Sequence, residues 1–203
     1  MFEDYINITK EKFLENRVIP VLFILSVLLL TLQFRYYFGL NSSTGTLQNI
    51  LYNISSGSLM ITENDFDIPM NVFGFHLIPI MFFLIPFYKV FGISFVYILS
   101  ALMVFIYSLS FYYLSKEMGL KNKLSSVIAI FTIINSTIIV GSLFTLTFRF
   151  LSIGVLSVAI YHLEKDNFKN TFYLFLTFLL FGEAGAPIGF SYGIYMIIFK
   201  KEK

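Results

Sequence analysis

Long apolar runs with almost no charge, separated by polar and basic stretches, follow one another from Val18 to Phe199. A helix needs about twenty apolar residues to cross a hydrocarbon core of about 30 Å. Four runs approach that length: Val18–Phe38, Ile93–Ser115, Leu124–Gly141 and Leu143–Leu163. A fifth, Thr171–Phe199, is too long for one upright helix and contains helix breakers over Gly182–Pro187. The pattern predicts an all-α integral membrane protein with about six transmembrane helices, two of them from the last run.

The segment between the first two predicted crossings, residues 39–92, is mostly polar and ends in the apolar stretch Leu77–Phe91. At about 15 residues this stretch is too short to cross comfortably, so we expect a membrane-dipping helix. Basic residues gather in the tail 1–17 and at 116–123, 165–169 and 200–203. The positive-inside rule places all four on the cytoplasmic side only if Leu77–Phe91 does not cross. We therefore expect one polytopic domain over 1–203, with both termini cytoplasmic and a large outer loop over 39–92.

Composition agrees with a chain solvated by lipid. Hydrophobic residues make up 57% of the sequence, charged residues 13%, and the mean hydropathy is +0.80. A soluble domain has about a quarter of its residues charged. The net charge of +2 gives no reason to expect nucleic acid as a partner, and the sequence has no cysteine, glycine-rich phosphate loop or nucleophile elbow.

Several short motifs follow one another along the chain in a recognisable order. They are Leu51-Tyr52-Asn53, then Gly57, then Phe75-His76-Leu77-Ile78-Pro79 and Pro86-Phe87-Tyr88. Their order and spacing resemble a family of uncharacterised prokaryotic polytopic membrane proteins, a domain of unknown function whose pattern reads Gln-x-Leu-Trp-Asn, Gly, His-Phe-x-Pro and Pro-Leu-Tyr. That family is thought to belong to the GT-C-type membrane glycosyltransferases. The resemblance implies a GT-C-like scaffold in a prokaryotic cell membrane.

The chain also departs from that family at positions that matter for catalysis. The outer-loop stretch Asn41–Gly45 lacks the acidic residue that GT-C enzymes place soon after the first helix. The family's Phe-His-Pro-Glu falls on Phe148–Leu151, and its Lys-Glu-Asp falls on Gly182–Ala184, where only Glu183 is kept. We therefore expect a non-catalytic scaffold that serves as a subunit or lipid-phosphate-binding module of a membrane complex. The alternative is an active glycosyltransferase that uses a lipid-linked sugar; a small transporter is disfavoured because no inverted repeat is visible.

Three residues are candidates for contact with a lipid phosphate. Arg149 lies near the outer end of its predicted helix and could fork two oxygens of a polyprenyl phosphate, or contact ordinary headgroups or Glu183 instead. Glu183 is an acid deep within an apolar run, which marks a functional hypothesis, although headgroups could also solvate it. His76 opens the dipping helix, where a lone histidine is more often an interfacial hydrogen-bonding residue than a base.

The outer loop carries two further kinds of candidate. Glu63, Asp65 and Asp67 could hold Mg²⁺ or Mn²⁺, but such a run is more often a solvated turn, so we expect no metal and no cofactor. Asn41 and Asn53 begin acceptor sequons on the outer side and are candidates for glycosylation. The expected partners are membrane lipids, among them a polyprenyl-phosphate lipid, and other membrane protein subunits.

Overall fold

The computed structural model describes residues 2–36, 42–61, 70–71, 79–143 and 147–182, and further on 187–188, 190–191 and 194–195. Nearly all of them are helical, which confirms the predicted helical class. One antiparallel pair, β1 (Met60–Ile61) with β2 (Met70–Asn71), is the exception among these residues. The helices are α1 (Phe2–Tyr36), α2 (Ser42–Ser55), α4 (Ile80–Phe91), α5 (Ile93–Glu117), α6 (Asn122–Ile134), α7 (Ser136–Leu143), α8 (Phe148–Leu151), α9 (Ile153–Glu164) and α10 (Phe168–Leu179).

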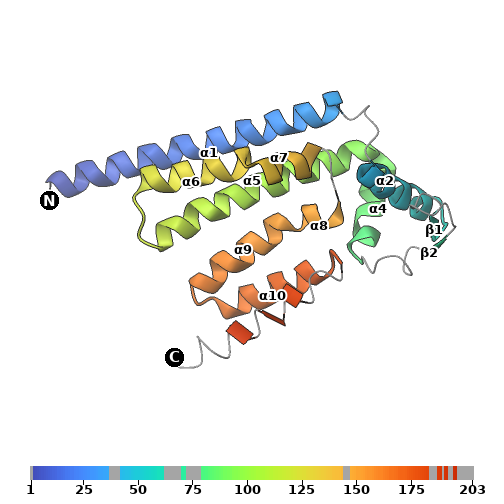
Figure 1. Cartoon of the computed structure of the whole chain (residues 1–203). Helices are drawn as coiled ribbons and strands as arrows, with labels where there is room; N and C mark the ends of the chain where they lie inside the picture. The colour runs from blue at the N-terminus through green and yellow to red at the C-terminus, as the bar shows by residue number, and fades with distance from the viewer. Residues whose placement is uncertain are drawn as a thin grey trace.

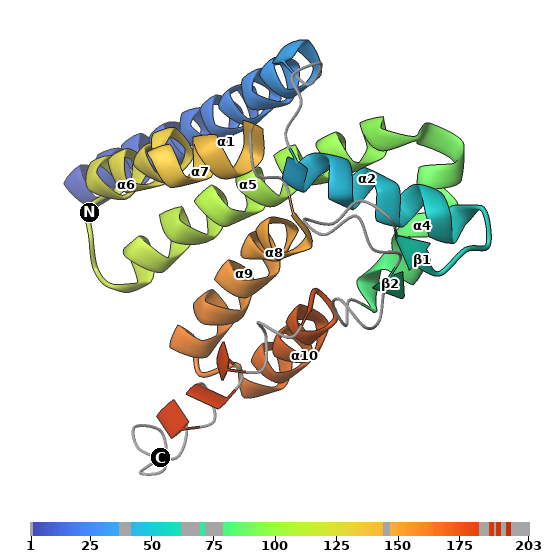
Figure 2. The same cartoon turned by 45° about the vertical axis from the view of Figure 1, so that its right-hand side comes forward.

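The long helices form a bundle with a small cap at one end. In both views α1, α5 and the α6–α7 pair lie side by side, and α9 and α10 extend the bundle beside α5 (Figures 1 and 2). The cap consists of α2, α4, β1 and β2, all within the predicted outer loop. Among the described residues, three helical segments are long and apolar enough to cross a membrane: Arg17–Arg35, Ile93–Glu117 and Asn122–Leu143. The integral membrane class follows from these segments, while the total of six crossings stays a prediction.

The bundle surface carries large apolar side chains in positions where a soluble protein would place polar ones. Phe23 and Ile24 of α1, Ile98 of α5 and Phe131 of α6 are all exposed. Continuous apolar surface of this kind is avoided by soluble monomers and is expected for helices that face lipid. The exposed positions therefore mark the sides of α1, α5 and α6 that contact acyl chains.

One predicted crossing, Leu143–Leu163, is wrong as a single helix. The described backbone divides there into the end of α7, the one-turn helix α8 and the separate helix α9. Thr147 explains the start of α8, because its Oγ1 accepts a hydrogen bond from the backbone N–H of Phe150 at 3.2 Å. Threonine side chains offer the backbone this alternative to a continuing helix and are favoured at helix starts. Among the described residues, a new helix therefore begins after Thr147 and divides at Ser152 into α8 and α9.

The last apolar run shows a break close to the predicted position. Helix α10 begins at Phe168 and ends at Leu179, just before Gly182, which has a φ of 134°. A φ in this range suits glycine because side chains with a Cβ rarely adopt it. The short helical pieces between 187 and 195 run back beside α10 in both views (Figures 1 and 2). This arrangement agrees with two antiparallel segments rather than one long helix.

The basic ends of the helices gather opposite the cap. The start of α1, the α5–α6 connection and the α9–α10 connection lie at the same end of the bundle (Figure 1). Lys165 Nζ lies 2.8 Å from Glu117 Oε1, so an ion pair joins the last two of these regions. The Glu117 carboxylate and the Tyr161 hydroxyl raise the pKa of Lys165 above its usual value. The positive-inside rule requires these basic regions to lie on one side of the membrane, and their position at one end of the bundle agrees with it. That this side is the cytoplasmic one stays a prediction.

Helix α4 has the geometry expected of a membrane-dipping helix. It begins at Ile80, slightly later than predicted, and its 12 residues span only about 18 Å, too little to cross the core. One face is buried in the cap, whereas the opposite face exposes Phe82, Phe83, Phe87, Val90 and Phe91. The Phe87 ring stacks on Phe95 of α5 at 5.0 Å, so this apolar face continues onto the lipid-facing side of the bundle.

This geometry gives a prediction about lipid contact. The sequence contains no tryptophan, so single tryptophans introduced at Phe83 and Tyr52 report their own surroundings. Both side chains are 63% exposed, but Phe83 lies on the apolar face of α4 and Tyr52 on α2. In vesicles containing brominated lipid we expect strong fluorescence quenching for Phe83→Trp and little for Tyr52→Trp. Equal quenching of the two would contradict a dipping α4 covered by a water-facing α2.

Candidate functional site

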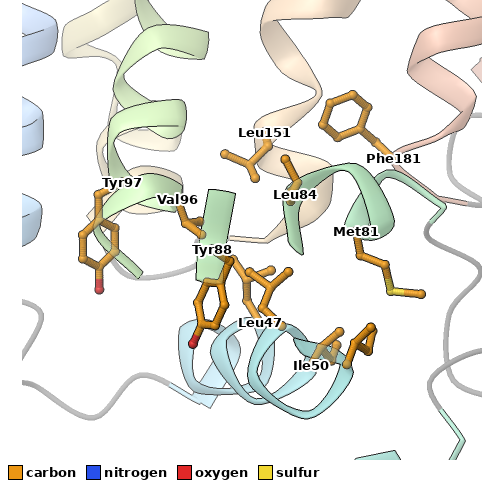
Figure 3. Packing of buried hydrophobic residues seen from close by; sticks show 11 residues of the cluster. Leu47, Ile50, Met81, Leu84, Tyr88, Val96, Tyr97, Leu151 and Phe181 are labelled. Carbon is orange, nitrogen blue, oxygen red and sulfur yellow. The ribbon is translucent and has the colours of Figure 1, made fainter. Parts of the chain in front are cut away.

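The cap is held to the bundle by an apolar cluster at its centre. Leucine and isoleucine recur in α2 at 47, 50, 51 and 54, the spacing that places them on one helical face. Figure 3 shows this face against α4, with α5, α8 and Phe181, just beyond α10, completing the cluster. The buried members are Leu47, Ile50, Leu51, Ile54, Met81, Leu84, Tyr88, Val96, Tyr97, Leu151 and Phe181. Helix α2 is thus a structural part of the cap that sequence reading missed.

The residues in and after α2 that carry the family resemblance stabilise the structure of the cap. Leu51 is fully buried in the cluster, and the Asn53 side-chain amide donates to Asn49 Oδ1. Gly57 ends the helix with a φ of 91°, a conformation that favours glycine. Its N–H donates to Ile54 O at 3.0 Å and the next N–H, of Ser58, donates to Asn53 O at 2.8 Å, the pattern of a glycine C-cap. These motif positions therefore build the cap.

Three chain segments that carry predicted site residues meet at the cap. The N–H of Ile80, at the start of α4, donates to Leu180 O just after α10 at 2.8 Å. Leu151 of α8 and Phe181 lie in the same buried cluster as α4. The structure therefore brings together the start of α4, the end of α8 and the end of α10, which are distant in sequence.

The predicted site residues are only partly within the described structure. Arg149 belongs to α8, whose backbone is placed, but its side chain lies outside the described part. The other phosphate-contact candidates, the possible metal ligands and one sequon asparagine lie outside the described residues: His76, Glu183, Glu63, Asp65, Asp67 and Asn41. Within the described residues, no three histidine, aspartate or glutamate side chains gather in a way that could hold a metal ion.

Asn53, the second sequon asparagine, is half-buried near the end of α2. The side-chain nitrogen that would carry a glycan donates to Asn49 Oδ1. Glycosylation at either sequon stays a prediction, and at Asn53 the acceptor amide is engaged within a helix.

A buried polar node that sequence reading missed lies where α1, α5 and α7 meet. Gln33 is 3% exposed, and its Nε2 donates to Ser100 Oγ at 3.0 Å and to Ser142 O at 2.8 Å. Hydrogen bonds between helices through Gln and Ser side chains are a common means of fixing membrane helices. In the sequence, this interaction is indicated only by the presence of a polar residue, Gln33, inside the first apolar run.

Comparison with known proteins supports the membrane assignment. The family described as "Predicted membrane protein (DUF2079)" matches residues 43–203. No curated protein and no solved structure matches the chain. The matched region includes the cap, α5 to α10 and the sequence motifs discussed above. The chain therefore belongs to this family of predicted membrane proteins.

Proposed function

We propose that this protein is a lipid-phosphate-binding membrane module with a GT-C-like scaffold that acts as a non-catalytic subunit of a larger membrane complex. One observation carries the proposal: the backbone segments leading to His76, Arg149 and Glu183 converge at the cap. The hydrogen bond between Ile80 N and Leu180 O fixes two of these segments to each other, and Leu151 packs into the same cluster.

Chain length limits how far the candidates can lie from this point. His76 precedes Ile80 by four residues, and Glu183 follows Leu180 by three. An extended chain covers at most about 3.6 Å per residue, so each Cα is held within about 15 Å of the Ile80–Leu180 hydrogen bond. Arg149 is two residues from the buried Leu151. These limits keep all three candidates in the region of the cap, and binding of one ligand headgroup by all three is part of the proposal.

The chemistry of these residues favours an anion. A guanidinium is always charged and can form two parallel hydrogen bonds to phosphate oxygens. Few charged residues lie within the apolar runs of this chain, and Arg149 is the one proposed to donate to a phosphate at the membrane surface. Polyprenyl phosphates combine such a headgroup with an acyl-like chain, which the apolar face of α4 could accommodate.

Departures from the resembling family's pattern favour a binding role over turnover. Asn41–Gly45 contains no acid to activate an acceptor, and Arg149 stands where the resembling family has histidine. General acid–base catalysis needs such a group within hydrogen-bonding reach of the reacting atom. We therefore expect no glycosyl transfer by the purified chain alone. Turnover that depends on Glu63, Asp65, Asp67 or Glu183 would favour the alternative of an active glycosyltransferase.

The binding role is tested by substituting Arg149. We expect Arg149→Ala to weaken retention of a polyprenyl-phosphate lipid about tenfold or more, because a charged hydrogen bond contributes roughly 1.5–3 kcal/mol. Retention is measured with the detergent-purified protein and a radiolabelled lipid. The matched control is Arg35→Ala, which removes an exposed guanidinium from the last turn of α1. Equal retention by wild type and Arg149→Ala would refute the role.

A further inference from the structure

Helices α6 and α7 are two parts of one apolar segment that breaks at Asn135. The segment runs from Asn122 to Leu143 and is long and apolar enough to cross a membrane. Asn135 ends α6 in an extended conformation, with a φ of −59° and a ψ of 133°, and α7 begins at the next residue. At a helical rise of 1.5 Å per residue, Asn135 lies about 20 Å from one end of the segment and about 12 Å from the other. The break therefore lies at membrane depth.

The break exposes three consecutive polar residues on the outside of the bundle. Asn135, Ser136 and Thr137 are all exposed. Asn135 Oδ1 accepts a hydrogen bond from the Thr137 N–H at 2.8 Å. Among the residues that the structure describes, none accepts a hydrogen bond from the Asn135 amide nitrogen or from the two hydroxyls. Acyl chains offer no acceptor, and irregular backbone at this depth is tolerated where protein or water covers it.

The two hydroxyls lack the partner that a membrane helix ordinarily supplies. Thr31, also exposed, donates from its Oγ1 to Val27 O one turn earlier in α1, at 2.9 Å. Such a bond to the preceding turn satisfies a hydroxyl within its own helix. Ser136 and Thr137 are the first two residues of α7, and the turn before them is interrupted at Asn135. Their partner must therefore come from outside the helix.

We propose that this face of α6 and α7 is the surface through which two copies of the chain associate in the membrane. The other side of the two helices packs on α1 and α5. Exposed apolar side chains stand on both sides of the polar break in the sequence, namely Phe131 and Ile134 before it and Val140 after it. Contact between two such faces would bury the polar groups among apolar side chains and away from acyl chains.

A second copy is the partner whose chemistry fits the break. Copies inserted in the same orientation place Asn135 at the same depth, and a two-fold axis along the membrane normal brings the two breaks opposite each other. A side-chain amide has two donors and an oxygen with two lone pairs, so each Asn135 can donate to the polar groups of the other copy. Hydrogen bonds of asparagine across helices, and close approach over serine and threonine, are usual between membrane helices. The face is thus self-complementary, and its association does not depend on the proposed lipid binding.

Proximity of two copies is tested by disulfide formation in native membranes. The sequence has no cysteine, so Ser136→Cys carries the only thiol of each copy. We expect oxidation with copper phenanthroline to convert this variant into a covalent dimer. The control is Leu176→Cys, an exposed position on α10, which lies across the bundle from α7 (Figures 1 and 2), and there we expect no dimer. Absence of the Ser136→Cys dimer, equal yields in both variants, or a crosslink to a different protein alone would overturn the proposal.

The strength of association is measured by energy transfer between labelled copies in lipid vesicles, with the dyes on a cysteine introduced at the exposed Ser58. We expect association to weaken about tenfold or more in Asn135→Leu, which removes the amide. Ser136→Phe should weaken it as much, because it adds bulk to the face while leaving the hydrogen bond between Asn135 and Thr137 in place. Thr177→Phe, at an exposed position of α10, is the control and should associate like the wild type. A wild type that is monomeric at all protein-to-lipid ratios, or unchanged association in either variant, would refute the interface.

Discussion

Replacing Gly154 with alanine is expected to destabilise the protein, although alanine is the better helix former. In an unhindered helix the change from glycine to alanine is favourable by about 1 kcal/mol. Here the new Cβ would lie 2.8 Å from Met103 Sδ, 2.9 Å from Met103 O and 3.1 Å from Met103 Cα. Helix α9 must therefore move away from α5, and overpacking of this kind costs about 1–3 kcal/mol. Gly154→Val, with a larger branched side chain, should be worse still.

The measurement is the melting temperature of the purified protein in detergent, with Leu102→Ala as the control. Leu102 neighbours Met103 on α5 but is exposed to lipid, so its loss should change stability little. Adding Met103→Ala to Gly154→Ala should restore only part of the stability, because the clash with the Met103 backbone remains. A melting temperature equal to or above that of the wild type for Gly154→Ala would show that the two helices can separate freely.

The sequence predicted those parts of the fold that depend on length and polarity. The runs around Arg17–Arg35, Ile93–Glu117 and Asn122–Leu143 are long enough that no other element type suits them. The short α4 was also expected, because a 15-residue stretch with internal prolines cannot cross a membrane comfortably. These features follow from the thickness of the hydrocarbon core and the length of each apolar run, and they do not depend on which helices are in contact.

Features that depend on contacts between distant residues were missed. The apolar positions of α2 have helical spacing, but serine, threonine, glycine and asparagine around them suggested a loop, and the partner surface on α4 supplies the stability. The start of a new helix at Thr147 was not recognised, because threonine is an ordinary residue within an apolar run and its role depends on the hydrogen bond from the Phe150 N–H to its hydroxyl. Gln33 was overlooked for the same reason, since its role depends on Ser100 and Ser142 far along the chain.

The same distinction applies to the candidate site. Glu183 was chosen because charge in an apolar run is costly, and Arg149 because a guanidinium near the membrane surface can fork a lipid phosphate. Both arguments need only the sequence. The meeting of the neighbouring chain segments with the start of α4 could not be derived that way, because it depends on the Ile80–Leu180 hydrogen bond and on Leu151 in the cap cluster. The motif residues of α2, in contrast, drew attention as part of a family pattern and proved to shape the cap.

We expect cysteine labelling on intact cells to distinguish the two ends of the bundle completely, with labelling at the cap and none at the basic end. Single cysteines at Ser58, Lys121 and Asn167 lie at exposed positions, the first in the cap and the other two at the opposite, basic end. With a membrane-impermeant thiol reagent on intact cells, we expect labelling at Ser58 only, because moving the basic end to the outer side would oppose the positive-inside rule. Lys121 and Asn167 should become reactive after permeabilisation, which is the control for accessibility.

Two other outcomes would each identify a specific error. Labelling of Lys121 and Asn167 with protection of Ser58 would mean that the whole bundle is inverted. Labelling of Ser58 and Lys121 together would mean that α4 crosses the membrane, because one added crossing moves the α5–α6 connection to the other side. In that case the two ends of α4 would lie on opposite sides of the membrane, and the proposed binding of one outer headgroup by His76, Arg149 and Glu183 would fail.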